Sequence, residues 1–203
     1  MMKYYSYKIE HDFGLAPNPF GGYCTLAVCR PTIRGNKNLE IGDWIIGTGS
    51  AKLKNLHHLI YAMKVEEKLT FNEYWNDSRF KYKKPQIKGS LVQIYGDNFY
   101  HQDLVTQKWI QEDSAHSFPT GLPNPGHIKV DTDGKYVLIS KTFYYLGDKS
   151  ILIPEDLRDV CSNGRNMKGP SINIKNAAKF IKWIQSIYKL GIHGNPISWK
   201  NIK

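Results

Sequence analysis

The segment from His11 to Tyr23 limits the fold more than any other part of the chain. Pro17 and Pro19 fix the backbone on either side of Asn18, and the glycines of the segment permit conformations that other residues avoid. We therefore expect a rigid loop, longer than an incidental turn, that holds the Asn18 amide and the Phe20 ring in fixed positions. An amide suits reading of a base edge and a ring suits stacking on a base, although a structural turn is the alternative.

Short apolar or alternating runs, bounded by turn residues, predict β-strands on both sides of this loop. The runs lie at residues 3–9, 24–29, 43–47, 59–65, 91–95 and 136–145. A helix is expected to begin at Thr70, because Thr70 and Glu73 have the spacing of a capping box.

The most regular helical pattern lies near the end of the sequence. Apolar residues recur there at steps of three and four, namely Ile174, Ala177, Ile181, Ile184 and Tyr188. Lysines gather on the opposite side, namely Lys175, Lys179, Lys182 and Lys189. The apolar side predicts core packing, whereas the lysine side is either a phosphate-facing ridge or a plain solvated face.

These patterns together predict an α+β fold. We expect a mixed, curved or barrel-like sheet, covered by a few helices and ending in the amphipathic C-terminal helix. With no internal repeat and no low-complexity linker, residues 1–203 are expected to form one domain, in which residues 160–203 are a basic helical extension packed on the rest.

The positive charge is concentrated after Asp159. Of the formal net charge of +10, residues beyond Asp159 contribute +8, since Arg165, Lys168 and six lysines follow it and no acidic residue does. This skew predicts a polyanionic partner or a phosphate-bearing ligand, although a solubility function explains it equally well.

A second basic segment alternates cations with aromatic rings between Arg79 and Lys84. In an extended backbone the cations would share one face and the rings the other, which is the arrangement of proteins that bind single-stranded nucleic acids. An edge strand protected by lysines would have the same pattern and is the alternative. The phosphate-binding candidates are Arg79, Lys84, Lys175, Lys179 and Lys182.

Several classes of protein are not expected. No apolar run approaches the ~20 residues of a membrane-spanning helix, and no signal-peptide pattern opens the sequence, so a cytoplasmic protein without a membrane partner is expected. Cys24, Cys29 and Cys161 have no metal-binding spacing, and no flavin or nicotinamide signature is present, so we expect neither a metal nor another cofactor.

Candidate catalytic groups lie in the irregular stretch between residues 96 and 130. His116, within the sequence SAHS, is suited to proton transfer near neutral pH, and Asp97 is the carboxylate expected to orient it. Cys24 or Ser117 would serve as a nucleophile.

The stretches HDFGLAPNPFGGYCTLAVCRPTIR, GDWIIGTGS, LIYAMKVEEKLTFNEYW, GDNFYH and SAHS resemble the nucleotide modification associated domain family, second type. Members of that family are described as candidate DNA base hypermodification proteins of bacteria and phages, so phage defence is one expected setting. The resemblance implies a nucleotide or nucleobase ligand but supplies no reaction. The motif positions are Asn18, Phe20, Cys24, Thr25, Asp43, Trp44, Thr48, Asp97, Asn98, Tyr100 and His116.

A looser resemblance links Gly42-Asp43-Trp44 and IYAMKVEE to PUA-like folds of the EVE and ASCH type. That resemblance implies a modified base held in an aromatic-lined pocket. We expect the loop around Asn18 and the Gly47–Ser50 turn to converge on such a flat heterocycle.

The sequence therefore predicts a nucleobase- or nucleotide-binding protein of DNA base modification, with DNA as a further partner. As an enzyme it would catalyse hydrolysis or group transfer at a modified nucleotide. The alternatives are a non-catalytic reader of a modified base in DNA and a sponge that sequesters a free nucleotide signal.

Overall fold

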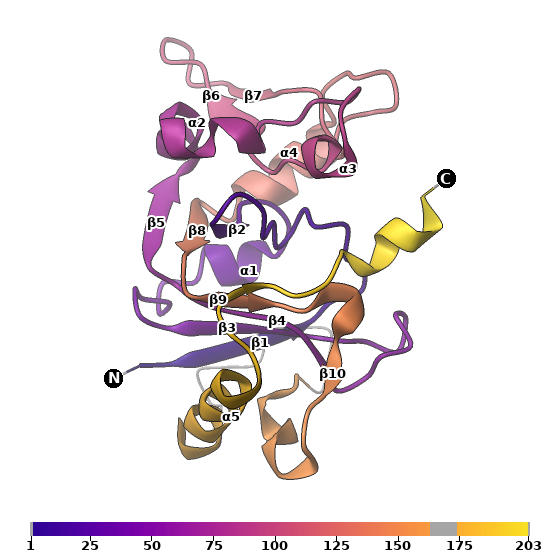
Figure 1. The fold of residues 1–203 in the computed structure, drawn as a ribbon. Helices are drawn as coiled ribbons and strands as arrows, with labels where there is room; N and C mark the ends of the chain where they lie inside the picture. Colours follow the sequence, from indigo (N-terminus) through magenta and orange to yellow (C-terminus); the bar gives the residue numbers. More distant parts are fainter. Residues whose placement is uncertain (1, 163–173, 203) are drawn as a thin grey trace. The chain divides into compact units, whose positions relative to one another are not determined.

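The computed structural model describes residues 2–162 and 174–202 (Figure 1). The described chain is a mixed α+β structure with separate sheets, as the sequence predicts, and none of these sheets closes into a barrel. Its contacts separate into two compact units that alternate along the sequence, and each unit is described by itself. Unit 1 contains Met1–Asp12, Leu39–Glu66 and Ser140–Lys203, and unit 2 contains Phe13–Asn38 and Glu67–Ile139. Arg165 and Lys168 lie outside the described residues.

Unit 1 is organised around one sheet with both parallel and antiparallel pairs. Its strands are, in spatial order, β1 (Tyr4–Lys8), β3 (Trp44–Thr48), β4 (His58–Lys64), β9 (Phe143–Tyr145) and β11 (Gly191–Ile192), and β10 (Ile151–Leu152) pairs with β4. β1 is parallel to β3, and β4 is antiparallel to both β3 and β9. The 3-10 helices η2 (Gly147–Lys149) and η3 (Glu155–Val160) lie before and after β10.

One face of this sheet is covered by α5 (Ile174–Ile187), as Figure 1 shows below β1. Ala177, Phe180 and Ile184 of α5 are fully buried in a core that includes Trp44 and Tyr144 of the sheet. The described part of the apolar stripe, from Ala177 to Ile184, is therefore core, and the side chain of Ile174 lies outside the described residues. Lys175, Lys179 and Lys182 of α5 and Lys189 after it are exposed. The helix is not the last element of the chain, because β11 and η4 (Ile197–Asn201) follow it.

Unit 2 is built from a three-stranded sheet, a separate hairpin and several short helices. The sheet has the order β2 (Cys24–Leu26), β8 (Tyr136–Ser140), β5 (Glu67–Thr70), and the hairpin is β6 (Tyr100–Gln102) with β7 (Trp109–Gln111). The helices are α1 (Pro31–Arg34), α2 (Phe71–Asn76), η1 (Ser78–Lys83), α3 (Leu91–Ile94) and α4 (Pro125–Thr132). Their core is aromatic, with Phe71, Tyr74, Phe80 and Phe99 buried together.

Local sequence signals in unit 2 are partly confirmed. α2 begins with the predicted capping box, in which Thr70 Oγ1 accepts a hydrogen bond from the Glu73 amide at 3.3 Å. The strand predicted at 91–95 is wrong, because Ser90 and Gln93 form a second capping box and start α3 there. The segment 79–84 is also not extended, since η1 turns Lys83 inward and leaves Arg79 exposed.

The small residue at position 47 is required by packing in unit 1. A Cβ atom on Gly47 would lie 2.2 Å from Cε1 of Tyr61 and 2.7 Å from Cδ1 of Ile9. The Tyr61 ring cannot easily move away, because its hydroxyl is hydrogen-bonded to that of Tyr7 at 2.8 Å. Close packing against Tyr61 therefore explains one glycine of the Gly47–Ser50 turn without a ligand.

We expect Gly47→Ala to destabilise the protein by about 1–3 kcal/mol in urea unfolding, through overpacking against Tyr61. Gly126→Ala is the control, because a Cβ at this position in α4 meets only Asn124 Oδ1, at 3.3 Å. Alanine is the better helix former, so Gly126→Ala should be neutral or stabilising. Equal destabilisation by both variants would contradict the packing explanation.

Candidate functional site

The turn at Cys29 connects β2 to α1 and has an unusual backbone. Cys29 and Arg30 both adopt positive φ angles, 55° and 42°, in the left-handed region that non-glycine residues seldom occupy. Such conformations cost on the order of 1–3 kcal/mol each and persist where surrounding contacts enforce them. Here the Cys29 amide donates to Asp131 Oδ1 at 2.7 Å, and Arg34 Nε donates to the Cys29 carbonyl at 2.7 Å.

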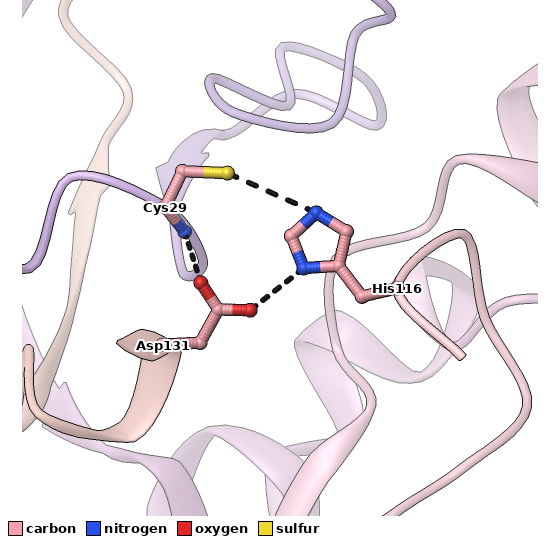
Figure 2. A group of neighbouring side chains, drawn as sticks. All are labelled: Cys29, His116 and Asp131. Atoms are coloured by element: carbon pink, nitrogen blue, oxygen red, sulfur yellow. Dashed lines mark hydrogen bonds and ion pairs between the residues drawn. The ribbon is translucent and has the colours of Figure 1, made fainter. Parts of the chain in front are cut away.

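The imidazole of His116 lies between the Cys29 thiol and the Asp131 carboxylate (Figure 2). His116 Nδ1 is 2.7 Å from Asp131 Oδ2, and His116 Nε2 is 3.9 Å from Cys29 Sγ. One ring nitrogen therefore faces a carboxylate and the other faces a thiol. This is the order of groups found in sites where a base, oriented by an acid, activates a nucleophile.

A self-bonded turn presents His116. The Ser117 amide donates to the Ser114 carbonyl at 3.0 Å, and the Ser114 amide donates to Ser117 Oγ at 3.1 Å. The His116 ring is held by edge contact with Phe99, at a centroid distance of 5.7 Å, and by stacking on His127 at 4.2 Å. Ser117, considered as a nucleophile, thus stabilises the turn that carries the histidine.

Asp131 is buried on α4 and both its oxygens accept hydrogen bonds. Oδ1 accepts from the Cys29 amide, and Oδ2 accepts from the Tyr100 hydroxyl at 3.0 Å besides facing His116. Tyr100 is in turn held by Gln111, whose Nε2 donates to its hydroxyl at 3.0 Å. The carboxylate is therefore fixed from three sides, which fixes the orientation of the imidazole.

Arg34 is fully buried behind Cys29 and binds backbone carbonyls. Its guanidinium donates to the carbonyls of Cys29, Tyr136 and Asp131, which belong to the turn, β8 and α4. Gly134 permits this, because a Cβ there would lie 2.4 Å from Arg34 Cζ.

The charged forms of His116, Asp131 and Arg34 are favoured at neutral pH. Burial acts to lower the pKa of His116, but hydrogen bonds with Asp131 and Cys29 outweigh burial and raise it to about 9. Burial acts to raise the pKa of Asp131, but the hydrogen bond and charge of His116, the Cys29 amide and the Arg34 charge together lower it below its ordinary value. Burial lowers the pKa of Arg34 only to about 10, so Arg34 is also charged at neutral pH.

A cavity of about 530 Å³ opens beside His116 within unit 2. Its walls are mainly apolar and aromatic, with Phe13 stacked on Tyr95 at 5.1 Å. Asp113 and His116 are the ionisable acid and base of its lining, and no Lys or Arg is found among the described residues that form it. The cavity therefore suits a flat or apolar group, and the His116 imidazolium is the charged donor of its lining.

The same three side chains also meet the distance requirement for a metal ion. Ligand atoms of Cys29, His116 and Asp131 lie within 4.8 Å of one another, a proximity that the sequence spacing did not indicate. Asp131, however, faces Nδ1 of the imidazole, whereas the thiol faces Nε2. Since both carboxylate oxygens already accept hydrogen bonds, the arrangement fits a nucleophile, base and orienting acid better than a three-ligand site.

Three predicted site residues, Asn18, Thr25 and Asp97, come together elsewhere in unit 2, in a buried hydrogen-bonded cluster. Asp97 accepts from Thr25 Oγ1 at 2.6 Å and from the Tyr74 hydroxyl at 2.8 Å. The buried Lys83 ammonium donates to the Asn18 carbonyl and to Thr25 Oγ1, both at 2.9 Å. The predicted pairing of Asp97 with His116 is not observed, because His116 is paired with Asp131.

The other candidates of unit 2 have backbone or core contacts. Cys24 is fully buried, and burial raises its pKa to about 12, which disfavours a reactive thiolate. Asn98 Nδ2 donates to the carbonyls of Tyr74 and Phe80 at 3.0 and 3.3 Å. The Phe20 carbonyl accepts from the Tyr82 hydroxyl at 2.9 Å.

The candidates of unit 1 shape its sheet. Asp43 accepts from the amides of Lys3 and Glu40 at 2.8 and 2.9 Å, and it also lines a hollow of about 240 Å³. Trp44 is buried and stacked on Tyr144 at 6.5 Å. Thr48 Oγ1 donates to the Tyr7 carbonyl at 3.3 Å. Because the Asn18 loop belongs to unit 2 and the Gly47–Ser50 turn to unit 1, their convergence stays a prediction.

The predicted phosphate-binding residues differ in their surroundings. Arg79 forms ion pairs with Glu67 at 2.8 Å and Asp77 at 2.7 Å, so acidic side chains already compensate its charge. Lys84 Nζ lies 3.3 Å from the centroid of the Trp75 ring. The remaining three, Lys175, Lys179 and Lys182, are exposed on α5.

Sequence reasoning found His116 and Tyr100 but missed Cys29, Arg34 and Asp131 as site residues. Asp131 is 102 residues from Cys29, so spacing along the chain carries no signal for their contact. A local signal existed for Cys29, which ends a predicted strand two residues before Pro31, a residue typical of the first turn of a helix.

Comparison with known proteins identifies the family. The family model described as nucleotide modification associated domain 2 matches residues 1–203, which confirms the resemblance seen in the sequence motifs. No curated protein and no solved structure matches the chain. Among the helices that the structure describes, none combines the length and apolar composition needed to cross a bilayer.

The ion pair of His116 with Asp131 predicts a dependence of stability on pH. A histidine has a pKa of about 6.5 in an unfolded chain, whereas the pKa of His116 is raised to about 9 in the folded protein. The stabilisation is thus complete below pH 6.5 and is lost as the pH rises to 9, with a total on the order of 3 kcal/mol. Urea unfolding of the wild type and His116→Asn at several pH values measures it, since asparagine keeps a donor toward Asp131.

Lys83 serves as an internal reference for this measurement. Burial lowers the pKa of Lys83 to about 8, so its own contribution makes stability rise between pH 8 and about 10.5. Both proteins contain Lys83, and the difference between them isolates His116. A difference that stays constant from pH 6 to 9.5 would show that the imidazole is not held in a charged pair.

We expect Lys83→Met to lower the free energy of unfolding by about 3 kcal/mol or more, because it leaves several buried acceptors unpaired. Lys81→Met is the matched control, since Lys81 is exposed two residues away on η1, and its effect should stay below about 0.5 kcal/mol. If both variants unfold at the same urea concentration, the cluster around Lys83 is not the structural support inferred above.

Proposed function

We propose that this chain, which belongs to the nucleotide modification associated domain 2 family, is a thiol-dependent enzyme that hydrolyses or transfers an acyl group on a modified nucleotide. The observation that carries the proposal is the order Cys29–His116–Asp131, with one ring nitrogen on the thiol and the other on a fixed carboxylate. The family links the chain to nucleotide modification systems, whereas the acyl chemistry is inferred from the side chains of Cys29, His116 and Asp131.

Each residue of the triad has one role in this reaction. Cys29 Sγ gives its proton to His116 Nε2 and attacks the acyl carbon, and Nε2 passes this proton to the leaving amine or alcohol as its bond to the acyl carbon breaks. A water molecule then gives a proton to Nε2 and attacks the thioester, and Nε2 returns that proton to Sγ as the carbon–sulfur bond breaks, which releases a carboxylic acid and restores the thiol. Asp131 keeps Nδ1 protonated and the ring oriented throughout both steps.

The adjoining cavity supports a nucleobase or its substituent as the bound group. Phe13 and Tyr95 supply flat apolar surface, and the described lining contains no Lys or Arg. His116 is both a wall of this cavity and the neighbour of Cys29 Sγ, so a group held in the cavity lies next to the catalytic base. A phosphate would remain outside the cavity.

A non-catalytic reader of a modified base is the second candidate function, and the exposed lysines of α5 favour it. A reader or a nucleotide sponge needs binding but no reactive thiol. The reactivity of Cys29 therefore separates these functions from the enzyme.

We expect iodoacetamide to alkylate Cys29 selectively in the folded protein. Cys24 and Cys161 are buried and serve as internal controls, so peptide mass spectrometry should find one fast adduct, absent in Cys29→Ser. Because Nε2 of His116 faces the thiol and can take its proton, His116→Asn should slow alkylation at pH 6 by about tenfold or more. Preferential labelling of Cys24, or rates at pH 6 that do not depend on His116, would rule out the triad as a nucleophilic site.

Turnover is tested by incubating the wild type and Cys29→Ser with nucleotides and DNA that carry amide- or ester-bearing bases, followed by mass spectrometry. The enzyme is expected to remove or transfer the acyl group and to form a thioester adduct at Cys29, and Cys29→Ser is expected to do neither. Binding without any mass change across the panel would favour the reader.

A further inference from the structure

Two adjoining hollows lie in unit 2 beside α4. Their volumes are about 500 and 430 Å³, and they share Trp109, Thr132 and Lys135 as lining residues. The hollows therefore form one continuous groove, which we call the Trp109 groove. None of its lining residues belongs to the cavity beside His116.

An aromatic side chain lies where the two hollows meet. Trp109 is half-buried and is supported by T-shaped packing against Phe71, at a centroid distance of 5.3 Å. Phe71 in turn packs against the Arg34 guanidinium, 5.6 Å from the ring centroid. Trp109 is thus held in place by the same packing that surrounds Arg34, and its indole offers a flat surface on which a base can stack.

Cations border the groove. Lys129 and Lys135 are exposed and line it, and Asp133 is the carboxylate among the described residues of its lining. The remaining lining combines apolar side chains with neutral amides and hydroxyls, the amides being those of Asn72 and Gln102. An aromatic surface flanked by lysines is the combination that single-stranded nucleic acids require, because cations follow the backbone while rings stack on bases.

The groove provides lysines, which the described lining of the cavity beside His116 lacks. The two sites share α4, whose Asp131 contacts His116 while Lys129 and Thr132 line the groove. A strand that places a base near His116 would therefore find Lys129 on the same helix and Lys135 three residues after its end. Two hollows in succession also fit consecutive nucleotides better than one mononucleotide.

We propose that the Trp109 groove binds single-stranded DNA, with a base stacked on Trp109 and backbone phosphates on Lys129 and Lys135. This inference extends the proposed function by making polymeric DNA, rather than a free nucleotide, the substrate. Binding to the groove does not require the thiol, so the two proposals can fail separately.

Fluorescence anisotropy with a fluorescein-labelled 12-residue oligodeoxythymidine tests the groove over a range of salt concentrations. In the full chain, Lys129→Gln with Lys135→Gln should weaken binding about tenfold and reduce the slope of log K against log salt by about 1.4, for two phosphate contacts at about 0.7 each. The matched control is Lys179→Gln with Lys182→Gln, which removes the same charge from α5 and should leave the slope unchanged.

Two substitutions at Trp109 separate stacking from packing. Trp109→Leu removes the flat surface and should weaken binding by roughly 5- to 150-fold, as expected for the loss of one stacked base. Trp109→Phe keeps a ring and should restore most of the affinity. Thermal unfolding shows whether each variant is folded at the temperature of the binding measurement. If Trp109→Leu is unfolded at that temperature, the affinity of Trp109→Phe is compared with that of the wild type instead.

The outcomes are distinct. A loss of affinity in the groove variants, with the α5 variant unchanged, supports the inference. An effect of the α5 pair alone, equal effects of both lysine pairs, or no binding of the oligonucleotide overturns it. The rate of Cys29 alkylation should be the same in the groove variants and the wild type. The alkylation experiment therefore tests the thiol-dependent function independently of DNA binding.

Discussion

The burial of the Arg34 guanidinium against three backbone carbonyls is the interaction on which the candidate site depends. Those carbonyls belong to the Cys29 turn, α4 and β8, so one side chain joins three segments that are distant in sequence. A charge buried in this way is stable only when its donors are satisfied, and the Phe71 ring closes the remaining side. The left-handed backbone of Cys29 persists because these contacts enforce it.

The candidate site and the Asp97 cluster illustrate two uses of buried polar groups within unit 2. Around Asp97 and Lys83, donors and acceptors satisfy one another in the core, which is typical of a structural network. Around His116, by contrast, one ring nitrogen faces a thiol and the ring borders a cavity. Proximity to a cavity and the presence of a nucleophile, rather than burial alone, distinguish a reactive site from a structural one.

Sequence patterns predicted the α+β class, the capping box of α2 and the buried stripe of α5, because each depends on residues close in sequence. The strand expected at 91–95 failed because a capping box at Ser90 outweighed a short apolar run. His116 was predicted from its residue type, but its partners Cys29 and Asp131 depend on tertiary contacts that no spacing reveals. The family motifs indicated a nucleotide ligand but no reaction, so the reaction is inferred from the side chains of the site.

The alternation of the two units along the sequence has a consequence for synthesis. Cys29 emerges from the ribosome 102 residues before Asp131, and a stretch of unit 1 is made between them. The turn that carries the thiol therefore lacks its carboxylate and histidine until residue 131 has been translated. A nascent chain that ends before α4 contains the Cys29 thiol without the two groups that surround it in the folded protein.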